Sequence, residues 1–229
     1  MPAVTTGTDA AAQQPPDLAA MRVTYTAGRL DEATVAATWH EQLQRWLAEA
    51  TAAGIVEPNA MVLATADTAG RASSRTVLCK GLDPRGVVFY SNHTSAKAHD
   101  LRDTRYASAT FPWLAIQRQV HLRGATERTT AEETVAYWTT RPRGSQLGAW
   151  ASAQSSPVGS RQALDGALEL VTRRYADTEA IPVPPHWGGT RIRPQSVEFW
   201  QGRDNRMHDR LRFRLVSATR EWVLERLQP

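Results

Sequence analysis

Polar and apolar side chains alternate between residues 206 and 215, with Asp209 as the one exception. One parity carries Arg206, His208, Arg210, Arg212 and Arg214, and the other carries Leu211, Phe213 and Leu215. Successive side chains leave a β-strand on opposite faces, so this alternation predicts a half-buried strand.

The basic face of this predicted strand has two interpretations. Arg206, His208 and Arg210 are expected to project side by side, with Asp209 behind them. Two guanidiniums beside an imidazole repel one another, which a fold tolerates best where an anionic or planar ligand lies between them. The alternative is a solvated strand face, and this is the interpretation expected for Arg212 and Arg214.

The rest of the chain changes its hydrophobic period several times. Helical spacing predicts helices at about 31–53, 94–103, 130–141, 145–152 and 160–175. Strand patterns lie at about 60–66, 71–82, 87–91, 106–114, 116–128, 191–200, 206–216 and 220–227. Turn signals at 67–70 and 83–86 join strands as hairpins, and Thr130 with Glu133 forms a capping box. These elements predict a small antiparallel β-barrel of the α+β class with inserted and flanking helices. No G-x-G-x-x-G follows a strand, which argues against a Rossmann site.

Composition places limits on domain organisation and compartment. The chain has 229 residues, enough for one domain, expected at 21–229 after a disordered tail at 1–20 that is rich in Ala, Thr, Gln and Pro. It has no run of 18 apolar residues, so no membrane span is expected, and residues 1–20 lack the features of a secretory signal. A single cysteine, Cys79, fits a reducing cytoplasm.

The charge balance points to small anionic ligands. The net charge is +4 and the pI about 9.6, without the basic blocks of a nucleic-acid-binding arm. Among 27 basic residues only Lys80 and Lys97 are lysines. A lysine retained in so arginine-rich a chain indicates a position that needs a compact charge.

Several segments combine basic and neutral polar groups in positions that suit phosphates and heterocycles. These are the strand 75–80, the helix start 95–97, Arg118-Gln119, the turn 141–145, Gln154-Ser155 and Trp200. Backbone N–H groups at helix starts and nearby cations suit phosphate, and an indole offers a stacking surface. Each segment alone is more often structural than functional. Together they supply two phosphate cradles and planar surfaces, which a phosphorylated aromatic cofactor beside a phosphorylated substrate requires.

Nine segments in order carry a resemblance to a known family. They are 75–80 (Arg-Thr-Val-Leu-Cys-Lys), 89–92 (Phe-Tyr-Ser-Asn), 111–113 (Phe-Pro-Trp), 118–120 (Arg-Gln-Val), 141–150 (Arg-Pro-Arg-Gly-Ser-Gln-Leu-Gly-Ala-Trp), 154–155 (Gln-Ser), 187–189 (Trp-Gly-Gly), 198–202 (Glu-Phe-Trp-Gln-Gly) and 206–210 (Arg-Met-His-Asp-Arg). From Arg22 to Pro229 the chain resembles pyridoxine (pyridoxamine) 5′-phosphate oxidase. The resemblance implies a homodimer of split β-barrels with FMN at the subunit interface, no metal ion, and neither nucleic acid nor membrane as a partner.

The resemblance also implies roles for individual residues. Those implied for FMN are Arg75, Lys97, Gln154 and Ser155 at the phosphate, Thr76, Val77, Leu78, Cys79, Lys80, Tyr90 and Ser91 along the flavin, and Gln119, Trp200 and Arg210 near its ring system. Those implied for a phosphorylated pyridine substrate are Lys80, Tyr137, Arg141 and Ser145 at its phosphate, the catalytic candidates Arg206 and His208 over its ring, and a lid from Arg22 to Tyr25.

The implied reaction oxidises the 4′ carbon of pyridoxine or pyridoxamine 5′-phosphate to the aldehyde of pyridoxal 5′-phosphate. A hydride passes to flavin N5, and dioxygen accepts the electrons as hydrogen peroxide. Ala96 and Cys79 depart from the family's usual arginine and leucine, and Val23-Thr24 is atypical for the lid. Two alternatives remain open: a related FMN oxidase of secondary metabolism, of the phenazine-pathway type, and a flavin- or pyridoxal-phosphate-binding protein without turnover.

Overall fold

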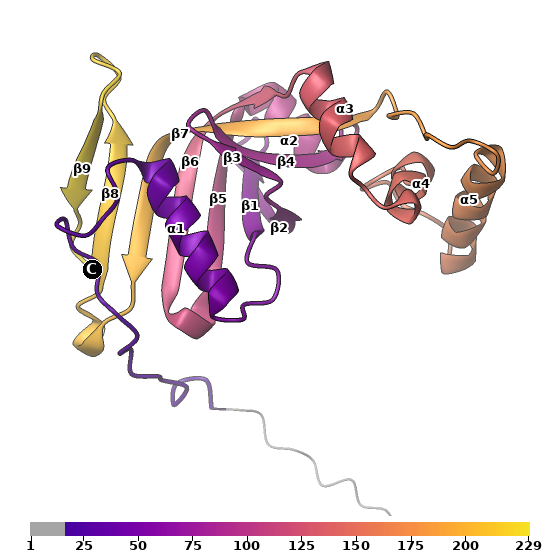
Figure 1. Cartoon of the computed structure of the whole chain (residues 1–229). Helices are drawn as coiled ribbons and strands as arrows, with labels where there is room; N and C mark the ends of the chain where they lie inside the picture. Colours follow the sequence, from indigo (N-terminus) through magenta and orange to yellow (C-terminus); the bar gives the residue numbers. More distant parts are fainter. Residues whose placement is uncertain (1–16) are drawn as a thin grey trace, which may run out of the picture.

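A computed structural model describes residues 17–229 as a curled antiparallel sheet with five helices (Figure 1). The strands are β1 (Ala60–Ala66), β2 (Ala72–Leu78), β3 (Gly81–Asp83), β4 (Gly86–Asn92), β5 (Tyr106–Trp113), β6 (Arg118–Arg128), β7 (Trp187–Gln201), β8 (Asp209–Leu215) and β9 (Trp222–Arg226). The helices are α1 (Trp39–Ala52), α2 (Ala96–Thr104), α3 (Ala131–Thr139), α4 (Arg143–Ala151) and α5 (Arg161–Arg174), with short 3-10 turns η1 (Leu114–Ile116) and η2 (Asp204–Arg206). Residues 1–16 of the predicted tail at 1–20 lie outside the described residues.

Strand β7 connects the two ends of the sheet. Its 15 residues pair with β6 along most of their length, with β4 through residues 187–192 and with β8 through residues 196–201. The register with β6 shifts between Arg123 and Gly124, beside Pro194. A side chain at Gly124 would lie 1.9 Å from the Arg193 carbonyl oxygen, so only glycine allows this close approach. The irregularity bends the strand, and β7 changes direction within its length (Figure 1).

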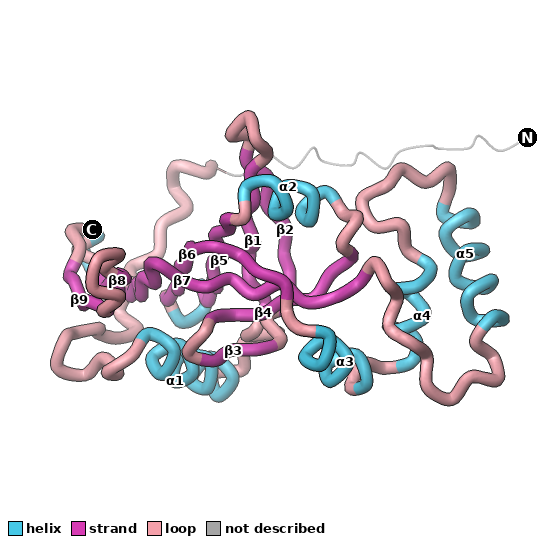
Figure 2. The backbone as a smooth tube through the Cα atoms, turned by 90° about the horizontal axis from the view of Figure 1, so that it is seen from above, coloured by secondary structure: helices cyan, strands magenta, loops and turns pink. Residues whose placement is uncertain are grey.

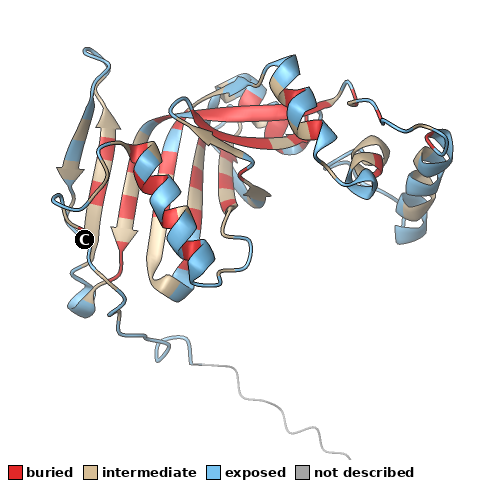
Figure 3. Ribbon diagram, in the orientation of Figure 1, coloured by how far each residue is buried: buried red, intermediate tan, exposed pale blue. Residues whose placement is uncertain are grey.

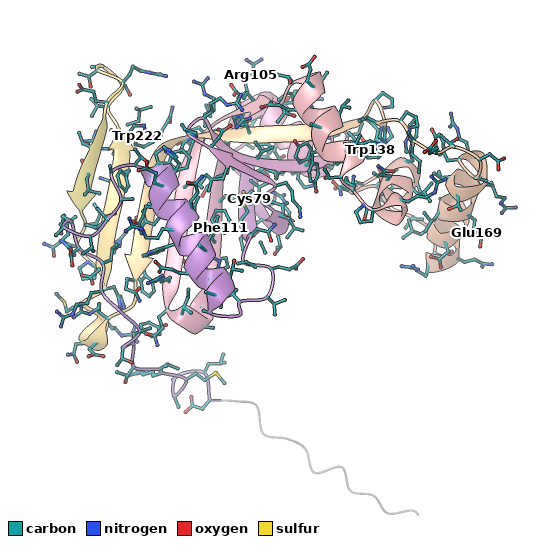
Figure 4. The ribbon with its side chains drawn as sticks, in the orientation of Figure 1. Cys79, Arg105, Phe111, Trp138, Glu169 and Trp222 are labelled. Carbon is teal, nitrogen blue, oxygen red and sulfur yellow. The ribbon has the colours of Figure 1, made fainter. Side chains whose placement is uncertain are left out.

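Helix α1 packs its apolar stripe on the concave side of the sheet (Figures 1 and 3). Trp39, Leu43 and Trp46 are buried, as their helical spacing predicts, and Trp46 meets Phe199 with ring centroids 5.3 Å apart. The main hydrophobic cluster also contains Phe111 and Cys79, which Figure 4 labels beside this helix.

The predicted start of the first helix is wrong. The helix begins at Trp39 rather than at Asp31, because the Thr38 side chain caps it by accepting the Glu41 N–H. The Asp31 carboxylate instead accepts the N–H groups of Ala33 and Thr34 and holds a turn.

Helices α3, α4 and α5 form an arm on the opposite side of the molecule from β8 and β9 (Figures 1 and 2). The arm has its own hydrophobic cluster, built from Trp138, Leu147, Tyr175, Ile181 and Trp187. The predicted capping box at Thr130 and Glu133 is confirmed at the start of α3. None of the helices within residues 17–229 is both long and apolar enough to cross a membrane.

The single strand predicted at 71–82 is two strands. β2 ends at Leu78, and the Lys80 N–H donates to the Val88 carbonyl at 2.7 Å, so the chain has already joined a different neighbour before β3. The other predicted helices and strands are present with boundaries shifted by a few residues. The antiparallel sheet with inserted and flanking helices confirms the predicted α+β class.

Candidate active site

A cleft of about 690 Å³ opens between the β2 edge, β4, and helices α3 and α4. It brings together most of the residues that the sequence predicted for cofactor and substrate phosphate. These are Arg75, Thr76, Val77, Leu78, Lys80, Tyr90, Ser91, Lys97, Tyr137, Arg141, Ser145 and Gln154. The residues come from segments far apart in sequence, so only the folded chain assembles them.

One end of the cleft holds two cations without a carboxylate partner. Lys97 lies in the first turn of α2, and its Nζ donates to Ser95 Oγ at 3.2 Å and to Gln154 Oε1 at 2.7 Å. Arg75 reaches Thr65 Oγ1 at 2.7 Å, and within residues 17–229 neither cation forms a salt bridge. Burial, and then the charge of Arg75, lowers the pKa of Lys97. A bound anion at this helix start would relieve both effects.

The other end of the cleft holds Arg141 on an aromatic shelf. Its Cζ lies 4.6 Å from the ring centroid of Trp187 and 5.2 Å from that of Trp138. Tyr90 and Tyr137 stack beside Trp187, with their own centroids 4.1 Å apart. The shelf therefore holds the guanidinium against the wall of the cleft.

The hydrogen bonds of Arg141 are incomplete. Its Nη2 donates to the Ser145 carbonyl at 2.9 Å, whereas Nη1 is buried without a hydrogen-bond partner among residues 17–229. Burial lowers the pKa of this guanidinium. A buried cationic donor without an acceptor is costly, and an anionic oxygen would satisfy it.

A second hollow, of about 810 Å³, gathers four other predicted residues. Arg22, Tyr25, Arg206 and His208 line it, together with neighbours in 21–26 and 203–205. The Tyr25 ring lies 5.7 Å from that of His208, and Trp200 lies 4.7 Å from His208 between ring centroids. The N-terminal segment and the β7–β8 connection thus meet at this hollow.

The predicted strand register at the start of this basic segment is wrong. β8 begins at Asp209, and Arg206 lies in η2 with a φ of 60°. Arg206 and His208 therefore share a turn rather than a strand face with Arg210. Arg212 and Arg214 are not simply solvated either, since both bind Glu225 at 2.6 Å.

The turn fixes which nitrogen of His208 carries a proton. The backbone N–H of Arg203 donates to His208 Nδ1 at 3.1 Å. A nitrogen that accepts this bond has no proton, so the neutral ring carries its proton on Nε2. Burial, and then the charge of Arg206, lowers the pKa of His208, which favours this neutral form.

The remaining predicted residues lie outside both hollows. Gln119, Trp200 and Arg210 stand opposite one another on β6, β7 and β8. Ser155 is exposed after α4. The Cys79 thiol points into the core and donates to the Gly81 carbonyl at 3.3 Å, and burial raises its pKa.

The two groups of predicted residues lie at opposite ends of β7. Trp187, its first residue, lines the cleft, and Trp200, near its last, touches His208. A strand of 15 residues has a contour of about 45 Å. The two groups are therefore well separated along the sheet of one chain.

Sequence reasoning missed several residues that line the cleft. Asn92, Gly148, Ala149 and Trp187 belong to quoted segments but had no role assigned, and Ser152, which follows α4, had none either. Asn92 Nδ2 donates to the Ser152 carbonyl at 3.1 Å and so fastens α4 to β4. The available signal was the position of this polar residue at the end of a mostly apolar, buried strand.

Comparison with known proteins shows to which family the chain belongs. A family model described as pyridoxamine 5′-phosphate oxidase matches residues 47–175, more than half of the chain. The chain belongs to this family. A second model, described as the pyridoxine 5′-phosphate oxidase C-terminal dimerisation region, matches residues 187–229 and supports a homodimer.

Individual relatives agree with this membership. The chain is 62% identical over 213 residues to a pyridoxine/pyridoxamine 5′-phosphate oxidase of Saccharopolyspora erythraea, covering 93% of this chain and 95% of the relative. Among solved structures, PhzG from Burkholderia lata 383, in complex with tetrahydrophenazine-1-carboxylic acid, matches with a TM-score of 0.77 and 34% identity over 82% of this chain and 91% of that one.

A more distant structure supports the fold alone. It is a pyridoxamine 5′-phosphate oxidase-related, FMN binding protein from Nostoc punctiforme PCC 73102, with a TM-score of 0.68 and 18% identity, covering 85% of this chain and 98% of that chain. The shared curled antiparallel sheet confirms the predicted split β-barrel. Membership of the family confirms the predicted enzyme class, an oxidoreductase.

Proposed function

We propose that this chain, as a homodimer with FMN, oxidises pyridoxine 5′-phosphate or pyridoxamine 5′-phosphate to pyridoxal 5′-phosphate. The observation that carries the proposal is a pair of cationic sites in one cleft, Lys97 with Arg75 at one end and Arg141 at the other, which form no salt bridge within the described part of the chain. Two phosphorylated ligands bound together need two such sites. The high identity to named oxidases supports the same reaction.

The residues at the α2 end fit the phosphate of FMN. Lys97 and Arg75 would supply charge, and Ser155 and the amide of Gln154 would supply further polar groups. Thr76 to Lys80, with Tyr90 and Ser91, would lie along the flavin. When bound, FMN supplies the acceptor for the hydride, and dioxygen is the proposed final acceptor.

The residues at the Arg141 end fit the phosphate of the substrate. An anionic oxygen would satisfy the buried Nη1 of Arg141, and Tyr137, Ser145 and Lys80 line the same wall. Fixing this remote phosphate lets its binding energy orient the reacting 4′ carbon toward the flavin.

The second group of residues is proposed to come from the other subunit. FMN is much shorter than the β7 contour between the two groups, so one chain alone would not place both groups on one flavin. A dimer that sets the hollow of Arg206 and His208 over the cleft of its partner would complete the site. His208 would then offer Nε2–H as a hydrogen-bond donor rather than act as a base, because Nδ1 is occupied by the Arg203 N–H.

The proposal is tested by the absorption spectrum of the purified protein. We expect a flavin spectrum that bleaches when pyridoxine 5′-phosphate is added without oxygen, and returns with hydrogen peroxide release when oxygen is admitted. A flavin that stays oxidised with both pyridoxine and pyridoxamine 5′-phosphate would overturn the vitamin substrate and favour a binding protein without turnover. The cytoplasm is the proposed location.

The phenazine-pathway alternative deserves a direct comparison, because the PhzG structure is similar over most of its length. The Arg141 end of the cleft argues for a phosphorylated substrate, since its buried donor needs an anionic oxygen. Flavin reduction by a reduced phenazine carboxylic acid, but by neither vitamin phosphate, would support the alternative.

A further inference from the structure

The face of the sheet opposite α1 carries a row of mostly polar residues from three strands, β6, β7 and β8. His121 of β6 stands opposite Glu198 of β7, and Trp200 of β7 stands opposite Arg210 of β8. Residues of the other parity, such as Phe199 and Leu211, are fully buried in the core beneath α1. Glu198, Trp200 and Arg210 therefore share one face.

Glu198 holds the Arg210 guanidinium by two parallel bonds. Arg210 Nε donates to one Glu198 carboxylate oxygen at 2.7 Å, and Nη2 donates to the other at 3.1 Å. A third bond runs from Nη1 to the Gln228 carbonyl at 2.8 Å. Bonds to all three nitrogens fix the plane of the guanidinium, and two of its five N–H groups remain for a ligand.

The partnership between these two residues is specific. The side chain of Glu198 is only 14% exposed, and Arg210 is the cation that it binds in the part of the chain the structure describes. The neighbouring His121 bonds to Ser108 Oγ at 2.7 Å, and burial lowers its pKa although the charge of Glu198 raises it, so the neutral ring is favoured. The next two arginines of β8 use a different carboxylate, Glu225.

We propose that Glu198 is a positioning residue that presents Arg210 to the flavin in one orientation. The inference rests on the proposed function and on the family resemblance, which implies that Arg210 lies near the FMN ring system. Without the carboxylate, the guanidinium would lose two of its three anchors and rotate about its side-chain bonds. The free N–H groups would then reach FMN in only a fraction of the population, which weakens binding in proportion.

The test is a double-mutant cycle on FMN affinity, measured by fluorescence titration of the FMN-free dimer. Glu198→Gln keeps the size of the side chain but turns one acceptor into a donor that faces Arg210. We expect the FMN dissociation constant to rise about tenfold, equivalent to about 1.4 kcal/mol. Glu225→Gln on β9, which weakens the carboxylate contacts of two other β8 arginines, Arg212 and Arg214, is the control and should stay within about twofold.

The second arm distinguishes positioning from a general structural effect. If Glu198 acts through Arg210, adding Glu198→Gln to Arg210→Ala should raise the dissociation constant no further. Glu198→Asp, which keeps the charge but is too short for both bonds, should weaken FMN binding less than Glu198→Gln and provides the test if the glutamine variant does not fold. A wild-type constant in the single variants, or a full further rise in the Arg210→Ala background, would overturn the inference. Wild-type protein that binds no FMN would instead overturn the proposed function.

Discussion

Replacing Arg191 by methionine should destabilise the protein more than any exposed arginine would. Its side chain is 4% exposed and bonds to Asp83 at 3.0 Å and to Glu133 at 2.7 Å, joining β7 to the β3–β4 turn and to the start of α3. Removing one partner of a buried ion pair costs about 3–5 kcal/mol. Arg85 still binds both carboxylates in the variant, so we expect the lower end, about 3 kcal/mol.

The matched control is Arg193→Met on the same strand. Arg193 is 52% exposed and makes one bond, to Glu127 at 3.3 Å, so its loss should cost less than about 1 kcal/mol. Urea unfolding at fixed dimer concentration, followed by tryptophan fluorescence, gives both free energies of unfolding. Equal losses in the two variants would refute the assignment of the network as a buried one.

The same network predicts a dependence on pH. Burial alone would raise the pKa of Asp83, but hydrogen bonds from Arg85 and the charge of Arg191 lower it below its ordinary value. The Thr130 N–H, with Arg85 and Arg191, lowers the pKa of Glu133 as well. Carboxylates with lowered pKa values stabilise the fold above their unfolded pKa and lose that contribution as the pH falls through the folded one. The difference between wild type and Arg191→Met should therefore shrink below about pH 4.

Three further predictions concern ligand binding. Ala96→Arg should tighten FMN binding about 10- to 100-fold in a fluorescence titration, because Ala96 is exposed beside Lys97 and a charged hydrogen bond contributes about 1.5–3 kcal/mol. An unchanged dissociation constant would mean that the FMN phosphate lies elsewhere. Arg141→Ala should act mainly on KM for pyridoxine 5′-phosphate, because the guanidinium is proposed to bind the remote phosphate; a loss confined to kcat would contradict that role. Arg206→Ala should leave FMN content intact and lower kcat/KM, with part of the loss in kcat, whereas Arg161→Ala, whose side chain is 81% exposed, should match wild type in peroxide release.

The sequence could predict most elements because local patterns determine them. The capping box at Thr130, the turn at 83–86 and the helical spacing of Trp39, Leu43 and Trp46 are all local signals. The predicted element boundaries were wrong where a contact with a residue outside the pattern determines the backbone conformation. The alternation of basic residues predicted a strand that begins at Arg206. The hydrogen bond from the Arg203 N–H to His208 Nδ1 instead holds a turn there.

The candidate site was predictable as a set of residues but not as an arrangement. The family resemblance implied roles for twelve residues that the cleft of one chain assembles. The predicted residues divide into this cleft group and the group near Arg206 and His208. That division depends on which strand each half of β7 pairs with, and no local pattern encodes that pairing. The clamp from Glu198 to Arg210 likewise depends on the register between β7 and β8.

The two-ended pairing of β7 has a genetic consequence for the proposed dimer. Each chain would contribute its cleft to one site and its Arg206 turn to the other. A homodimer with a substitution in either part would therefore carry that lesion in both of its sites. A mixed dimer of Arg141→Ala and Arg206→Ala chains would carry one site with both lesions and one with neither. Random reassociation of the two impaired homodimers should then leave about a quarter of all sites without a lesion and raise activity above that of either homodimer, as in intragenic complementation between alleles.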